Sequence, residues 1–156
     1  RYVGWVAGEK NNEAFTAGSQ PGTGVVGGDA PALASLKARY PDAHFLGRRT
    51  GRELAGCYAA ADVFVFPSRT DTFGLVMIEA LACGTPVAAY PVAGPCDIIT
   101  DDVGAMCEDL DRAIAAALFC DRKVCAAYGA GFTWASATGQ FLNGLAAFDA
   151  EELPIV

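Results

Sequence analysis

Hydrophobic residues along this chain gather in short runs that alternate with segments of helical spacing. The run "VFVF" is apolar at four successive positions, which indicates a strand buried on both faces of a parallel sheet. The expected strands are Arg1–Val6, Thr23–Gly27, Ala43–Leu46, Asp62–Phe66, Val87–Tyr90 and a weaker Gly104–Cys107. The expected helices are Asn12–Ala17, Pro31–Tyr40, Gly51–Ala60, Phe73–Cys83, Leu110–Phe119 and Thr133–Phe148.

This alternation of strands and helices predicts the α/β fold class. It is typical of a Rossmann-like, doubly wound parallel sheet with helices on both faces. The 156 residues contain no repeat and no internal linker, so we expect one domain. In open sheets of this kind a ligand binds beyond the carboxyl ends of the strands, where loops lead into helix N-termini.

Charge and hydropathy narrow the range of partners. The formal net charge is −7, and this disfavours nucleic acid, which is bound through surplus Lys and Arg. A small phosphorylated ligand stays open, since a helix N-terminus and one or two cations are enough to bind it. No apolar run approaches the roughly 20 residues of a membrane helix, and we expect a soluble protein.

The six cysteines are a possible sign of disulfides or of a metal site. They form no C-x-x-C pair, and His44 is the single histidine of the chain, so the ligand spacing of a zinc site is missing. Most of the cysteines lie inside apolar runs, where Cys behaves as a small hydrophobic residue. We therefore expect reduced, structural thiols, a cytosolic setting and no bound metal.

The segment Ser68–Thr72 is a loop of the kind that binds ligands in such sheets. It follows the buried "VFVFP" run and precedes the helix expected to start at Phe73. The backbone N–H groups at the start of that helix, from Phe73 to Val76, have no acceptor in a preceding turn. They therefore predict an anion site at this point of the chain.

Two acids, Asp71 and Glu79, flank the apolar run "FGLVMI". Eight helical positions at about 1.5 Å each would separate them by about 12 Å. Paired carboxylates of a glycosidase lie roughly 5–10 Å apart, so a hydrolase is disfavoured. The span suits an extended ligand with a hydroxylated group at each end and phosphate between, such as a nucleotide-diphosphate sugar. The alternative is that Asp71 caps the helix and Glu79 is a solvated surface acid.

The stretch "SRTDTFGLVMIEALACGTPVAAYPVAGP" resembles the nucleotide-sugar-binding signature of retaining glycosyltransferases of family 4, the group 1 glycosyltransferases. The matching features are Asp71 and Glu79 with seven residues between them, then an alanine, a short turn with Gly84 and Pro86, and the strand "VAAY". Upstream, "YVGWVAGEKN", "GGDAPALASL" and "HFLGRRTGRELAGCYAAADVFVFPS" are similar to the segments that precede this signature in the family.

The resemblance implies a role for individual residues of this chain. Asp71 would contact the transferred sugar and Lys10 would pair with the phosphates, so these two are the candidate catalytic residues. Glu79 would bind the ribose hydroxyls of the donor. The residues implied to border the sugar, the diphosphate or the nucleobase are Phe73, Gly74, Leu75, Val76, Gly47, Arg48 and Arg49.

The resemblance also implies an architecture and a reaction. The family uses the GT-B fold, two Rossmann-like halves with the active site between them, and residues 1–156 correspond to the C-terminal, donor-binding half. The implied activity is that of a hexosyltransferase that moves a sugar from a nucleotide-diphosphate donor, such as a UDP or GDP sugar, to a lipid or glycan acceptor. The implied partner is an N-terminal acceptor-binding domain outside this chain. No metal and no further cofactor are expected, and the complete enzyme would lie in the cytoplasm or against the inner face of the membrane.

Three residues depart from the family pattern. Trp5 follows the glycine of the first strand, where the family often has a phosphate-binding arginine; Asp71 is shorter than the usual glutamate; and Ala30 replaces a second glycine. Loss of the arginine would weaken the hold on the phosphates. The alternative function is therefore a catalytically inactive nucleotide-binding or scaffold module that keeps the fold.

Overall fold

The computed structural model describes residues 2–5, 24–27, 37–39, 41, 43–70 and 74–144. Within these residues six strands form a single sheet, and every neighbouring pair is parallel. The order across the sheet is β3-β2-β1-β4-β5-β6. The strands are β1 Tyr2–Trp5, β2 Gly24–Gly27, β3 His44–Gly47, β4 Val63–Phe66, β5 Val87–Ala89 and β6 Gly104–Met106.

The strand order reverses direction between β1 and β4. The chain runs outward from β1 through β2 to β3, then crosses back to β4 on the other side of β1 and runs outward again to β6. This order is that of the Rossmann fold, in which the ligand crevice opens at the reversal. The predicted fold class is confirmed, and the observed strands lie within one or two residues of the expected ones.

The helices agree with the sequence pattern less evenly. The helix expected over Gly51–Ala60 has those bounds, whereas α4 begins at Leu75 rather than at Phe73. Two helices were not predicted, the short α5 and the longer α7. The expected Asn12–Ala17 helix lies outside the described residues, and of Pro31–Tyr40 the structure describes residues 37–39 as helical. The helices observed from residue 51 on are α3 Gly51–Ala60, α4 Leu75–Ala82, α5 Pro95–Ile98, α6 Leu110–Ala117, α7 Arg122–Ala130 and α8 Trp134–Gly144.

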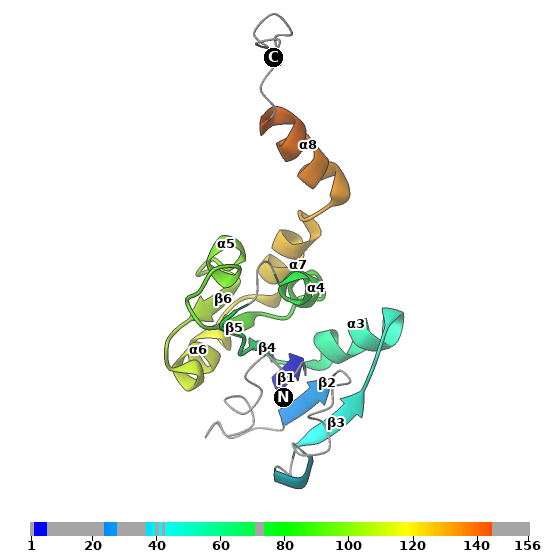
Figure 1. The fold of residues 1–156 in the computed structure, drawn as a ribbon, viewed down its shortest axis with the longest axis vertical. Helices are drawn as coiled ribbons and strands as arrows, with labels where there is room; N and C mark the ends of the chain where they lie inside the picture. Colours follow the sequence, from blue (N-terminus) through cyan, green and yellow to red (C-terminus); the bar gives the residue numbers. More distant parts are fainter. Residues whose placement is uncertain are drawn as a thin grey trace, which may run out of the picture.

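Helices cover both faces of the sheet, and the run "VFVF" of β4 shows why. Successive side chains of a strand point to opposite faces. Phe64 and Phe66 pack with residues of α3, α4 and α7, while Val63 and Val65 pack with those of α6. All four side chains are buried. Figure 1 shows α4 and α7 on one side of β4–β6 and α6 on the other.

Helices α4 and α7 lie in close contact. A Cβ atom added at Gly129 of α7 would fall against the backbone of Leu81 and Ala82 in α4, so the glycine allows the two backbones to approach. Asp121 caps α7 by accepting a hydrogen bond from the Lys123 backbone N–H at 2.7 Å. This cap was a sequence signal for the helix that the hydrophobic pattern alone did not reveal.

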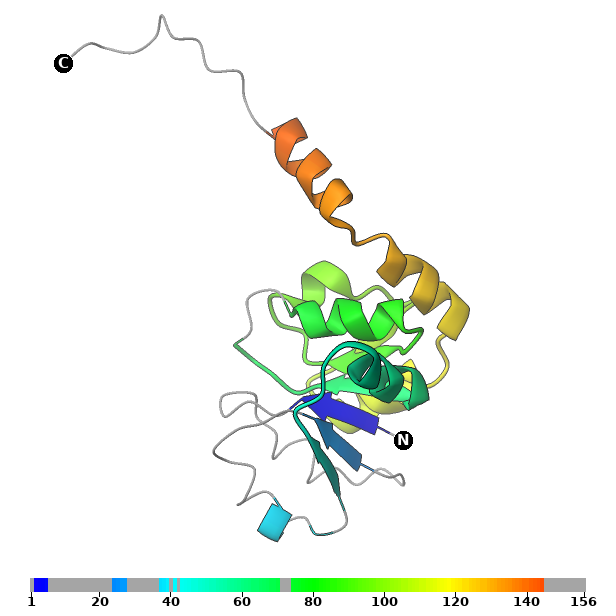
Figure 2. The same cartoon turned by 90° about the vertical axis from the view of Figure 1, so that its right-hand side faces the viewer.

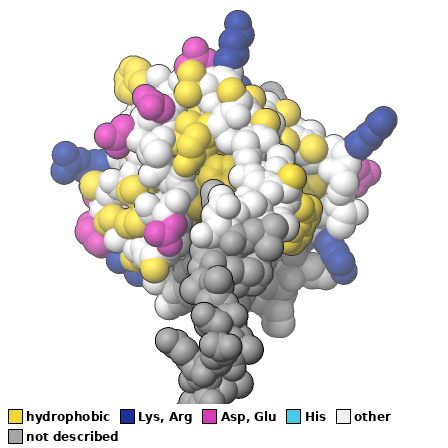
Figure 3. All heavy atoms as spheres, turned by 90° about the horizontal axis from the view of Figure 1, so that it is seen from above, with side chains coloured by type: hydrophobic (Ala, Val, Ile, Leu, Met, Phe, Trp, Pro, Cys, Tyr) yellow, Lys and Arg dark blue, Asp and Glu magenta, His cyan; other side chains and the backbone are white. Residues whose placement is uncertain are grey.

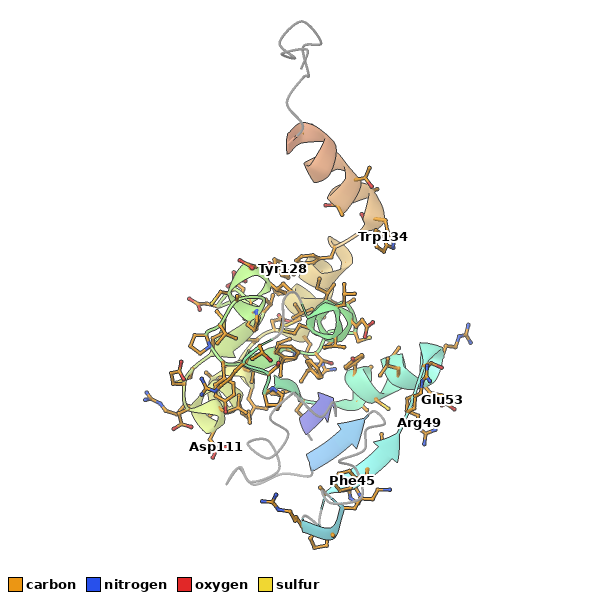
Figure 4. The ribbon with its side chains drawn as sticks, in the orientation of Figure 1. Phe45, Arg49, Glu53, Asp111, Tyr128 and Trp134 are labelled. Atoms are coloured by element: carbon orange, nitrogen blue, oxygen red, sulfur yellow. The ribbon has the colours of Figure 1, made fainter. Side chains whose placement is uncertain are left out.

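Helix α8 projects away from the sheet and its covering helices (Figures 1 and 2). Trp134, at its start, is 90% exposed, and Figure 4 shows this side chain beside the junction with α7. The view from above shows apolar atoms scattered between acidic and basic side chains (Figure 3). Among the described residues, no helix has both the length and the apolar character that crossing a membrane requires.

The six cysteines are free thiols, as expected. Cys125, a residue of α7, is fully buried in the core that α7 forms with α4, and burial raises the pKa of its thiol to about 11. Cys96 is exposed, and the other four are partly buried. The part of the chain that the structure describes contains no group of three or more His, Cys, Asp or Glu residues arranged to hold a metal ion.

Candidate functional site

The reversal of strand order between β1 and β4 brings the loop after β4 to the expected ligand crevice. This loop begins with buried Pro67 and Ser68, and the next helix, α4, starts at Leu75. Asp71, Phe73 and Lys10 lie outside the described residues. The roles expected for these three residues therefore stay predictions.

Gly74 forms the entry to α4. It is the N-cap residue and has a left-handed backbone, with φ 78°. Its carbonyl accepts a hydrogen bond from the Met77 N–H at 2.9 Å. The first turn of the helix therefore begins two residues later than the sequence pattern suggested, with Leu75 and Val76 as its first residues. Peptide dipoles at such a terminus favour a bound anion.

The two residues that open α4 face different surroundings. Leu75 is 65% exposed, whereas Val76 is partly buried and packs against the core. The exposed position of Leu75 suits the predicted contact with a bound ligand. The partly buried side chain of Val76 contributes to packing, so its contribution to a ligand would come from the backbone.

We expect Gly74→Ala to destabilise the protein by about 2 kcal/mol. A left-handed backbone costs roughly 1–2 kcal/mol for a residue with a Cβ atom. The added Cβ would also lie 2.5 Å from Cε of Met77 and 3.4 Å from Cζ of Phe66. Urea denaturation measures the loss.

Gly51→Ala is the matched control for this substitution. Gly51 also has a positive φ, 54°, but a Cβ there meets nothing within 4 Å. Its loss should therefore be the backbone cost alone, about 1 kcal/mol. Equal losses for the two variants would show that Met77 makes room without cost.

Glu79 lies about one turn into α4 and is exposed. Its Oε2 accepts a hydrogen bond at 3.2 Å from the hydroxyl of Tyr58, a residue of α3 that is 1% exposed. Burial, followed by the nearby charge of Glu79, raises the pKa of the Tyr58 hydroxyl far above its usual range. Tyr58 thus remains the proton donor, and the carboxylate is held by a neutral partner from a neighbouring helix.

Sequence reasoning did not identify Tyr58 as part of the site. It lies 21 positions before Glu79, in a segment whose spacing indicated a helix and nothing more. The contact arises because α3 and α4 pack on the same face of the sheet. The hydroxyl of a tyrosine in a mostly apolar helix face was the one available signal, since a buried hydroxyl requires a partner.

A second group of polar side chains lies at the carboxyl edge of the sheet. Arg69, in the loop after β4, forms an ion pair with Glu108 at 2.9 Å, and its guanidinium lies 3.7 Å from the centroid of the Tyr90 ring. Glu108 follows β6 and Tyr90 follows β5. The contacts connect three loops at one edge and place a cation two positions before Asp71. The sequence reading overlooked Arg69.

The candidate nucleobase segment follows β3. Gly47 ends the strand with φ 69°, and Arg48 is exposed. Arg49 forms an ion pair with Glu53 of α3 at 3.2 Å, and Figure 4 shows the two side chains together at the start of that helix. The structure therefore gives Arg49 a partner on the protein surface. The expected contacts of Gly47 and Arg48 with a base stay predictions.

Taken together, the described part of the site is built on α4. Gly74, Leu75, Val76 and Glu79 follow one another from its N-terminus, and Tyr58 supports Glu79 from α3. The carboxyl ends of parallel strands share one edge, so Gly47 and Arg48 belong to the same edge as the loop before α4. This arrangement, on a sheet of Rossmann order, places the candidate site at the edge where open α/β sheets bind their ligands.

Comparison with known proteins identifies the family. The family model described as glycosyl transferases group 1 matches residues 22–120, and the chain belongs to this family. A GDP-mannose-dependent alpha-mannosyltransferase of Mycobacterium tuberculosis is 43% identical over 101 residues, which are 64% of this chain and 27% of the relative. A GDP-mannose-dependent alpha-(1-6)-phosphatidylinositol dimannoside mannosyltransferase of the same species is 37% identical over 134 residues, 79% of this chain and 35% of the relative.

Solved structures support the fold. Anabaena HepE in complex with UDP-glucose superimposes with a TM-score of 0.67 at 20% identity, covering 92% of this chain and 49% of that protein. At this identity the likeness concerns the fold. The chain thus spans about a third or less of these two curated relatives and about half of this structural neighbour.

Proposed function

We propose that this chain is the donor-binding half of a retaining glycosyltransferase, with GDP-mannose as the preferred donor. The observation that carries the proposal is the exposed carboxylate of Glu79, held in place on the helix that opens at the ligand crevice. Membership of the group 1 family supports it. The dependence of both reported mycobacterial relatives on GDP-mannose supports the choice of donor.

Each part of the donor has a proposed partner in the chain. Glu79 accepts hydrogen bonds from the ribose hydroxyls, because a carboxylate accepts such bonds better than a neutral side chain does. The N-terminus of α4, from Gly74 to Val76, holds the diphosphate together with Lys10. Asp71 contacts the sugar that is transferred, and Gly47 with Arg48 border the base.

The proposed site has no need of a divalent metal. In this arrangement the charge that develops on the leaving diphosphate is stabilised by the helix N-terminus and by cationic side chains. We also propose no further cofactor, since the nucleotide sugar is the donor substrate.

Isothermal titration calorimetry with GDP, UDP and ADP tests the proposal. We expect GDP to bind more tightly than UDP or ADP. Binding of UDP in preference to GDP would retain the function and change the donor, and UDP is included because the structural neighbour was crystallised with UDP-glucose. Binding of none of the three would favour the alternative, a module of this fold that has lost its nucleotide site.

We further propose that the acceptor-binding half lies outside these 156 residues. The chain covers 27% and 35% of two mannosyltransferase relatives, which leaves room in them for a second half. A lipid-linked or polysaccharide glycan is the proposed acceptor class, in keeping with the phosphatidylinositol dimannoside named for one relative. The complete enzyme would then work in the cytoplasm, at the membrane surface where such an acceptor is presented.

Transfer requires donor and acceptor to be held together in a cleft that excludes water. We therefore expect this chain to bind nucleotide without turnover. Incubation with labelled GDP-mannose and lipid or sugar acceptors checks this. Formation of glycoside by the isolated chain would contradict the division into two halves.

A further inference from the structure

The carboxylate of Glu79 is exposed, yet it contacts a group that cannot move freely. Its Oε2 lies 3.2 Å from the hydroxyl of Tyr58. The tyrosine side chain reaches this position from the core, since the residue as a whole is 1% exposed. An exposed acid usually samples several rotamers, and a hydrogen bond from a rigid partner restricts that sampling.

Tyr58 is fixed by its ring and by its backbone. The ring packs edge-on against Phe64 of β4, with centroids 5.3 Å apart and an interplanar angle of 88°. Its backbone carbonyl accepts a hydrogen bond at 2.6 Å from the hydroxyl of Thr85, which is fully buried. The donor to Glu79 is thus anchored to the central sheet and to the turn that follows α4.

The end of α3 that carries Tyr58 is held by a further side chain. Arg122 of α7 donates hydrogen bonds to the backbone carbonyls of Ala59, at 2.7 Å, and Ala61, at 2.5 Å. Two of the last carbonyls around this helix end therefore have a cationic partner, which complements the negative end of the helix dipole. The position of Tyr58 is set by contacts from β4, α7 and the loop before β5.

We propose that Tyr58 is a positioning residue of the donor site, which orients the carboxylate of Glu79 for the two ribose hydroxyls. This inference rests on the proposed function of Glu79. An ionised carboxylate offers about four acceptor positions, so one bond from Tyr58 leaves enough for a vicinal diol. Because the acid is held before the ligand arrives, less conformational freedom is lost on binding.

Tyr58→Phe is the direct test, because it removes the hydroxyl and keeps the ring in the core. We expect GDP to bind about three- to tenfold more weakly in calorimetry, with the melting temperature changed by no more than about 2 °C. The stability effect is small since water can replace the lost donor at an exposed carboxylate.

Tyr128→Phe is the matched control. The Tyr128 hydroxyl, on α7 (Figure 4), donates to the backbone carbonyl of Ile98 at 2.8 Å, so it connects α7 to α5, whereas the Tyr58 hydroxyl donates to Glu79. Its removal should leave GDP affinity unchanged while lowering the melting temperature. A similar loss of affinity in both variants would overturn the inference, because it would show a general effect of loosening the fold.

Two further measurements separate positioning from other roles. In a Glu79→Ala background, adding Tyr58→Phe should change GDP affinity less than 1.5-fold, which corresponds to a binding free energy of about 0.2 kcal/mol. The effect is small because the two residues act as one unit. For 2′,3′-dideoxy-GDP, the wild type and Tyr58→Phe should bind equally weakly, because the diol that Glu79 recognises is absent.

The outcomes distinguish the inference from the proposed function. If the wild type binds GDP and Tyr58→Phe binds it equally well, the inference is overturned and the function stands. If Tyr58→Phe loses the same affinity in the Glu79→Ala background, Tyr58 acts by another route and the inference is again overturned. If the wild type binds no nucleotide, the proposed function fails and this inference fails with it.

Discussion

Glu79→Ala is expected to weaken GDP binding at least tenfold, which corresponds to about 1.4 kcal/mol. The substitution removes the carboxylate that would accept hydrogen bonds from both ribose hydroxyls. The methyl group of alanine cannot accept such bonds. It also leaves the Tyr58 hydroxyl without its protein acceptor. Because Glu79 is exposed, the fold itself should lose little stability.

The control for this result is Asp111→Ala, which also removes one negative charge. Asp111 lies on α6, which packs on the opposite face of the sheet from α4 (Figure 4). GDP affinity should stay within about twofold of the wild type, since screening at physiological salt acts over about 8 Å. Unchanged affinity in Glu79→Ala, or an equal change in both variants, would remove Glu79 from the site.

Gly129→Ala is expected to lower the free energy of unfolding by about 3 kcal/mol. The added Cβ would fall against the backbone at Leu81 and Ala82, and backbone cannot move aside as the end of a side chain can. The overpacking of a close helix contact typically costs 1–3 kcal/mol, and here α7 must shift as a unit relative to α4. Urea denaturation gives the value from the midpoint and slope.

Gly56→Ala makes the same chemical change in another helix and should have the opposite sign. Gly56 lies inside α3, and a Cβ there meets nothing within 4 Å. In the exposed interior of a helix, alanine is more favourable than glycine by about 1 kcal/mol, so this variant should be more stable than the wild type. Losses of similar size at both positions would show that the contact between α4 and α7 is not tight.

The sequence pattern predicted the sheet more accurately than the helices. A short strand buried on both faces needs apolar residues at consecutive positions, and "VFVF" showed this directly. Helix α7 was missed because its fully buried residues are small, a cysteine and a close-packed glycine, so the sequence shows no stripe of large apolar side chains there. The start of α4 was placed two residues early because the left-handed conformation of Gly74 is not visible in the hydrophobic pattern.

The sequence predicted only part of the candidate site, because some of its residues lie far apart along the chain. Glu79 and the α4 N-terminus follow each other along one segment, so their relation could be inferred from sequence spacing. Tyr58 lies 21 positions away from Glu79, and Arg69 lies 39 positions away from Glu108. Contacts over such separations depend on how helices and loops pack, which a local pattern does not contain.

The sequence by itself therefore determined the fold class, the parallel strands, the family and the segment that carries the candidate donor site. These follow from local periodicity, from turn residues and from a motif that is continuous along the chain. The tertiary structure alone decided that a buried tyrosine holds Glu79 and that Arg69 joins three loops at one edge of the sheet. Both contacts form because the order β3-β2-β1-β4-β5-β6 brings distant segments side by side, and burial of the apolar faces on each side then sets where their polar groups meet.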